Sequence, residues 1–95
     1  MSKFELTLNL IQTRLNQHLI DGYHRIWVQG CNTKETIIMF TIFNRDGYKM
    51  EFLKVRNFRQ YRPNSENQEE EREILERNIR SFRTSISEYV DFDNL

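Results

Sequence analysis

Alanine is absent from this sequence, and glycine (3), proline (1) and cysteine (1) are scarce. The single cysteine, Cys31, excludes an internal disulfide framework and a cysteine-rich zinc site, as is typical of proteins in a reducing compartment. Alanine, glycine and proline have G/C-rich codons, so their scarcity indicates an A/T-rich genome, such as that of a low-GC bacterium, its phages or its mobile elements.

Long apolar runs are missing as well. No stretch approaches the ~20 apolar residues that cross a bilayer, and the chain does not open with a basic segment followed by an apolar run. A chain of 95 residues is expected to form one domain, residues 1–95, around a single core. These features predict a protein of the cytoplasm, in a bacterial host.

No catalytic or metal-binding motif is present. His18 and His24 have no cysteine, histidine or carboxylate at motif spacing, and no serine lies in a nucleophile elbow. Five glutamates gather between residues 66 and 73, where they favour the start of a helix and solubility. The sequence therefore predicts no catalytic residue, no metal, no cofactor and no enzymatic activity.

The stretch from Glu35 to Val55 organises the chain. Every position from Thr36 to Phe43 is apolar or threonine, with many β-branched and aromatic residues, which predicts a central strand buried on both faces. The pair Asp46-Gly47 supplies two residues that tolerate φ > 0, as a tight hairpin turn requires. The alternating residues 48–55 then form the second strand of a β-hairpin.

Two further elements precede this hairpin. Residues 23–29 alternate, with His24, Ile26 and Val28 on one face and Tyr23, Arg25, Trp27 and Gln29 on the other, which predicts a half-exposed strand. An apolar stripe predicts an N-terminal helix that Asp21-Gly22 ends, although alternation over residues 3–10 leaves an edge strand there as an alternative. The stripe consists of Phe4, Leu8, Ile11, Leu15 and Leu19.

The C-terminal part carries a second helical stripe. It begins after a capping-box spacing at Ser65 and Gln68, and residues 91–95 are expected to fray. The stripe predicts one long helix and consists of Ile74, Leu75, Ile79, Phe82, Ile86, Tyr89 and Val90.

Together these elements predict an α+β fold in the order α-β-β-β-α. The sheet is antiparallel with three strands, or four if the residues before Pro63 form another, and the long C-terminal helix packs on one face. The N-terminal helix covers either the same face or the other one. The doubly apolar central strand favours cover on both faces.

A basic and aromatic stretch over residues 54–62 is a candidate nucleic-acid strip. Arginine forks match phosphate oxygens and aromatic rings stack on unpaired bases. Strand alternation would divide this set between two faces, and a net charge of zero with a pI near 6.7 is unlike most nucleic-acid modules. The candidates are Lys54, Arg56, Phe58, Arg59, Tyr61 and Arg62.

A protein-binding surface is the second class of hypothesis. Residues 1–64 have a net charge of +5 and residues 65–95 a net charge of −5, and aromatic residues make up 13% of the chain. Tyr23, Arg25 and Trp27 on one strand face would form a compact anchor, unless the N-terminal helix covers them. Leftover apolar surface on the last helix, at Phe82, Tyr89 and Phe92, could instead support a homodimer.

The order of elements resembles that of double-stranded-RNA-binding domains, but residues 67–71 of this chain are Asn-Gln-Glu-Glu-Glu in place of a Lys-rich signature, so only the order matches. Size and order are also similar to small phage proteins that block host nucleases, including anti-CRISPR proteins. The sequence thus predicts a non-enzymatic binding protein, an inhibitor or regulator of phage or mobile-element type that occupies a nucleic-acid-handling host protein. Direct RNA or DNA binding through residues 54–62 is the alternative.

Overall fold

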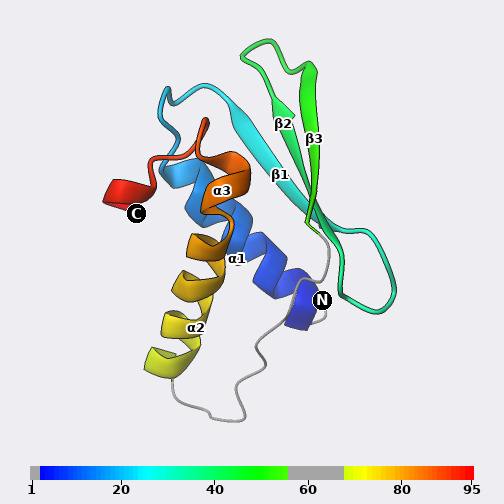
Figure 1. Ribbon diagram of the computed structural model, residues 1–95, viewed down its shortest axis with the longest axis vertical. Helices are drawn as coiled ribbons and strands as arrows, with labels where there is room; N and C mark the ends of the chain where they lie inside the picture. Colours follow the sequence, from blue (N-terminus) through cyan, green and yellow to red (C-terminus); the bar gives the residue numbers. More distant parts are fainter. Residues whose placement is uncertain (1–2, 56–67) are drawn as a thin grey trace.

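The computed structural model describes residues 3–55 and 68–95 of the chain. It is a small α+β domain with an antiparallel sheet, so the predicted class is confirmed (Figure 1). The stretch before Pro63, predicted to extend the third strand or to form a short fourth one, lies outside the described residues from residue 56 onward. The elements are helix α1 (Lys3–Gln17), strands β1 (Arg25–Gly30), β2 (Ile38–Phe43) and β3 (Lys49–Val55), helices α2 (Gln68–Ser81) and α3 (Arg83–Ile86), and a 3-10 helix η1 (Phe92–Asn94).

The sheet has the strand order β1-β2-β3, with both pairs antiparallel. The turn between β2 and β3 is held by Asn44, whose Oδ1 accepts hydrogen bonds from the backbone N–H groups of Asp46 (3.0 Å) and Tyr48 (2.9 Å). Among the turn residues only Gly47 has a positive φ, +83°. The prediction that Asp46 also takes this conformation is wrong, because a single left-handed glycine after Arg45-Asp46 already completes the turn.

Helix α1 closes the outer edge of β1. The Asn16 side chain accepts a hydrogen bond from Ile26 N (2.9 Å) and donates one to Ile26 O (2.9 Å). One turn earlier, Gln12 Oε1 accepts from Val28 N (3.0 Å). These amide side chains take the place of a further strand, because an edge strand presents unpaired backbone donors and acceptors. The predicted N-terminal helix is confirmed, although it ends at Gln17 and not at the predicted Asp21-Gly22, and the strand alternative at residues 3–10 is wrong.

The three α-helices lie on one side of the sheet (Figure 1). Arg14 of α1 forms an ion pair with Glu76 of α2 at 2.9 Å. The predicted cover on both faces of β2 is not found in the described part of the chain, where no helix lies on the second face. The core consists of Phe4, Leu8, Ile11 and Leu15 from α1, Ile26, Val28, Ile38, Phe40 and Ile42 from the sheet, and Ile79, Phe82, Ile86, Val90 and Phe92 from the C-terminal part.

The predicted single long C-terminal helix is interrupted at Phe82. The Ser81 hydroxyl donates a hydrogen bond to Asn78 O (2.5 Å), and Phe82 N donates to Ile79 O (3.1 Å), which tightens the last turn of α2. The Phe82 ring then meets Phe40 of the central strand edge to face, with centroids 5.0 Å apart. The break therefore directs an aromatic ring to the middle of the sheet.

The end of the chain is ordered rather than frayed, which corrects the prediction for residues 91–95. A backbone bridge joins Leu19 and Val90, with Ile20 N donating to Tyr89 O (2.9 Å). Of the three residues considered for a homodimer surface, Phe82 and Phe92 are buried in the core and Tyr89 is half-buried against it, and the homodimer itself stays a prediction. Helix α1 ends at Gln17, because the residues after it form this bridge instead of another turn.

Replacement of Asn16 by alanine is expected to lower the free energy of unfolding by about 1–3 kcal/mol, because it leaves the donor and acceptor of Ile26 without their partner. Urea denaturation followed by circular dichroism measures this change. Thr13→Ala, at an exposed position of the same helix, is the control. Equal stability of the two variants would show that the edge of β1 does not depend on the Asn16 amide.

Candidate partner-binding surface

The sheet face opposite the helices, here called the outer face, is defined by the register of β1 and β2. It contains Arg25, Trp27 and Gln29 on β1, which pair with Phe43, Thr41 and Met39 on β2. The neighbouring positions Ile26 and Val28 point into the core, so the predicted alternation of β1 is confirmed. The predicted anchor residues Arg25 and Trp27 are not covered by α1.

Trp27 is the most prominent side chain of the outer face, with 47% of its surface exposed. Its register partner Thr41 is 1% exposed, and the Thr41 hydroxyl has no hydrogen-bond partner in the described structure. A buried hydroxyl without a partner costs about 1–3 kcal/mol. Buried polar groups normally form hydrogen bonds, and positions where they do not are commonly functional or strained.

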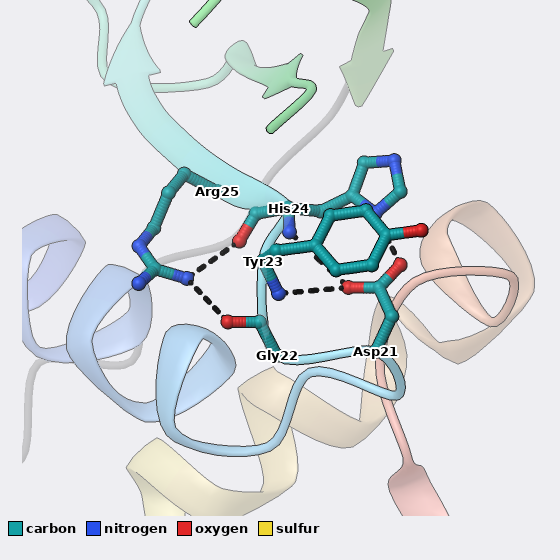
Figure 2. Close-up of polar contacts among 5 residues, drawn as sticks. All are labelled: Asp21, Gly22, Tyr23, His24 and Arg25. Atoms are coloured by element: carbon teal, nitrogen blue, oxygen red, sulfur yellow. Dashed lines mark hydrogen bonds and ion pairs between the residues drawn. The ribbon is translucent and has the colours of Figure 1, made fainter. Parts of the chain in front are cut away.

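Arg25 is exposed, but its guanidinium group is held in place. Its NH1 group donates hydrogen bonds to Gly22 O (3.1 Å) and to His24 O (2.8 Å), as Figure 2 shows. Because the side chain is already ordered by these carbonyl groups, a contact made by Arg25 loses little conformational entropy. Arg25 therefore presents a fixed positive charge beside the outer face.

The loop before β1 is built on Asp21. Its Oδ1 accepts hydrogen bonds from the backbone N–H groups of Tyr23 and His24, both at 3.1 Å, and its Oδ2 is hydrogen-bonded to the His24 ring (Figure 2). The His24 ring lies between two tyrosines, stacked on Tyr23 at a centroid distance of 5.0 Å and tilted against Tyr89 at 5.5 Å. This arrangement connects the start of β1 to the C-terminal segment.

The electrostatics of the loop keep Asp21 ionised. Removal of water from the carboxyl group opposes ionisation, but hydrogen bonds from the backbone amides of His24 and Tyr23 and from the His24 ring lower the pKa of Asp21 below its ordinary value. An ionised carboxylate only accepts hydrogen bonds, so Nδ1 of His24 carries the proton and donates it. The tautomer of His24 is thereby fixed.

The structure brings together only part of the predicted site. Arg25 and Trp27 share the outer face, whereas the Tyr23 ring packs on His24 and is 50% exposed. Lys54 lies on β3, in register with Met39. The other candidates fall outside the described residues; these are Arg56, Phe58, Arg59, Tyr61 and Arg62.

Sequence reasoning missed the pairing of Asp21 with His24. A signal was available, because an aspartate that follows a helix and precedes a strand commonly accepts hydrogen bonds from backbone amides two and three residues on. Sequence reasoning also assigned both faces of β2 to the core, so Phe43 and Met39 were not recognised as outer-face residues. In the described ranges, no group of three or more His, Cys, Asp or Glu side chains is arranged to hold a metal ion.

The variant Asp21→Asn is expected to show a smaller decrease in the free energy of unfolding at acidic pH than the wild type. The folded-state pKa of Asp21 lies below the ordinary value of 3.8, so its contribution is complete above that pH and is lost as pH falls through the lowered pKa. Asparagine retains the acceptor for the backbone amides but does not titrate. Denaturation series between roughly pH 2 and pH 6 measure the difference.

Asp46→Asn, in the exposed hairpin turn, is the control for this series. Asp91, whose pKa is lowered mainly by its hydrogen bond with Asn94, remains in both variants and keeps part of the acid dependence. Curves of the wild type and Asp21→Asn that stay parallel down to the lowest pH would contradict the role assigned to Asp21.

Within residues 3–55 and 68–95, no helix has both the length and the apolar character that crossing a membrane requires. Comparison of the chain with protein-family models, with curated proteins and with solved structures finds no match.

Proposed function

We propose that this is a non-enzymatic binding protein that acts by occupying a macromolecular partner through its outer face. The observation that carries the proposal is the half-exposed Trp27 beside the ordered Arg25, on a sheet face that no described helix covers. Tryptophan and arginine are the side chains that most often dominate binding energy at protein interfaces. A sheet face that only contacts water gains no stability from an exposed tryptophan or arginine.

Rigidity supports the same proposal. The backbone of β1 is held on one edge by the amides of Gln12 and Asn16 and on the other by β2. A surface that is already ordered loses little entropy on binding, so more of the contact energy appears as affinity.

For the identity of the partner, we propose a nucleic-acid-handling protein of a bacterial host, in its cytoplasm. The protein would act as an inhibitor or regulator of the anti-defence, anti-CRISPR-like kind encoded by phages and mobile elements. Three features of the sequence support this proposal. They are the amino-acid composition, which indicates an A/T-rich genome, the excess of arginine over lysine, and the opposite net charges of the two halves of the chain. Neighbouring genes that belong to a housekeeping operon would remove most of that support.

Direct binding of RNA or DNA through residues 54–62 is the second candidate. Lys54, the first residue of this stretch, belongs to strand β3 and is in register with Met39 of β2. The predicted fourth strand over the following residues belongs to this candidate.

The proposal predicts that Trp27→Ala prevents partner capture. The experiment uses tagged wild-type protein and the variants Trp27→Ala and Leu10→Ala. Each is incubated with lysate of a bacterium that has an A/T-rich genome, and the retained proteins are identified by mass spectrometry. Truncation of a central aromatic anchor costs at least ~2 kcal/mol, which is more than a tenfold loss of retained partner. Leu10 lies on α1 and is 47% exposed, the same fraction as Trp27, so it controls for loss of exposed apolar surface.

A protein that wild type and Leu10→Ala retain, and that Trp27→Ala loses, is the expected result. Each variant is first checked for an unchanged thermal midpoint. Identical sets of retained proteins for all three would contradict the assignment of the outer face.

A further inference from the structure

We infer that the partner segment on the outer face presents the carboxylate of an aspartate or glutamate to Arg25 and a large apolar side chain to Trp27. The inference rests on the proposed function, because it takes the outer face to be the contact surface and a protein to be the partner. It adds the chemistry of the segment that binds there.

The guanidinium group of Arg25 has unused hydrogen-bond donors. A guanidinium carries five N–H groups, and NH1 of Arg25 donates its two to Gly22 O (3.1 Å) and His24 O (2.8 Å). Nε and NH2 have no hydrogen-bond partner in the described part of the chain, and Figure 2 shows both nitrogens turned away from the two carbonyl groups. One N–H of NH2 lies parallel to the N–H of Nε, and this edge matches the two oxygens of a carboxylate.

Arg25 also lacks an ion-pair partner among the described residues. The nearest acidic residue along the chain is Asp21, whose oxygens accept hydrogen bonds from the His24 ring and from the backbone amides of Tyr23 and His24. The carbonyl groups of Gly22 and His24 orient the guanidinium but do not neutralise its charge. A carboxylate of the partner would supply the opposite charge in a bidentate geometry.

The position of Arg25 on β1 sets the distance to the second contact. Arg25 and Trp27 are two residues apart on one face of the strand, which corresponds to ~7 Å between their Cα atoms. In an extended segment, side chains two residues apart have the same separation and also point to one face. The segment that fits is therefore extended, with an acidic residue and a large apolar residue two positions apart.

The surroundings of this pair favour a protein segment over a phosphate backbone. Arg25 is the only charged residue of β1 and β2, whereas nucleic-acid strips hold phosphates with several cations. Its register partner Phe43 is half-buried, as is Met39 on the same face. Arginine, tryptophan, phenylalanine and methionine are all enriched at the centres of protein interfaces, so this composition matches a protein partner.

The test begins with a phage-displayed library of random dodecapeptides, selected on immobilised wild-type protein and on the variants Arg25→Gln, Trp27→Ala and Arg77→Gln. Arg77 is an exposed arginine on α2, on the helix side of the molecule, so it controls for the loss of one positive charge. Each variant is first checked for an unchanged thermal midpoint.

We expect wild type and Arg77→Gln to enrich peptides in which Asp or Glu lies two positions from a large apolar residue. Arg25→Gln is expected to lose the acidic preference and to keep the apolar one, because Trp27 remains. Trp27→Ala is expected to lose the apolar preference.

One enriched peptide is then synthesised with a fluorescein label, together with a second form in which the matching amide replaces its carboxylate. Anisotropy is expected to show about a tenfold weaker binding of the amide form to wild type, because the charge-assisted hydrogen bonds are lost. This comparison leaves the protein unchanged, so a folding defect cannot account for it. Arg25→Gln is expected to bind both forms equally, and Arg25→Lys to recover only part of the preference, because lysine keeps the charge but not the fork.

The inference is overturned if selection on wild type gives no acidic enrichment, if both peptide forms bind wild type equally, or if Arg25→Gln discriminates between them as wild type does. Displacement of the peptide by excess single-stranded oligo(dT) would assign the free edge of Arg25 to phosphate and would also overturn it. In each of these cases the proposed function stands as long as capture from lysate depends on Trp27. If capture does not depend on Trp27, the outer face is not the contact surface and both fail.

Discussion

The hydrogen bonds between the amides of α1 and the edge of β1 are the constraint on which the rest of the structure depends. A sheet in which β1 is an edge strand leaves that strand's backbone groups unpaired unless another element supplies donors and acceptors. Gln12 and Asn16, one helical turn apart, supply them in register with Val28 and Ile26. This register fixes both the position of α1 along the strand and the side of the sheet on which its apolar stripe lies.

Once α1 is fixed, the C-terminal elements have limited choices. The apolar residues of α1 and of the inner sheet face belong to one core. Phe82 joins that core through its ring contact with Phe40. In a continuous helix, the apolar residues of the C-terminal part would all lie along one straight helix axis. Because the helix is interrupted at Phe82, the last of these residues, such as Val90, lie next to the residues that follow α1. The bridge between Leu19 and Val90 then closes the far end of the core.

Much of this arrangement could be predicted because it follows from periodicity. The stripe of α1 and the alternation of β1 each specify a buried face, and the residues concerned, such as Ile11 and Ile26, are buried as expected. The break at Phe82 could not be predicted, because the apolar spacing continues across it and only local hydrogen bonds of Ser81 and Phe82 interrupt the helix. In the candidate site, alternation predicted Arg25 and Trp27, but the apolar run of β2 concealed which of its residues face outward.

The outward-facing residues of β2 could not be identified from the sequence for a physical reason that also bears on function. A strand with apolar residues on both faces reads as doubly buried, yet a 95-residue chain forms one core and its described helices all lie on one side of the sheet. Met39 and Phe43 remain half-buried, and Thr41 is buried with an unpaired hydroxyl. An outer face selected only for solubility would replace these residues by polar ones at little cost in stability. The proposed binding function gives these exposed and half-buried residues a role that packing of the single core does not supply.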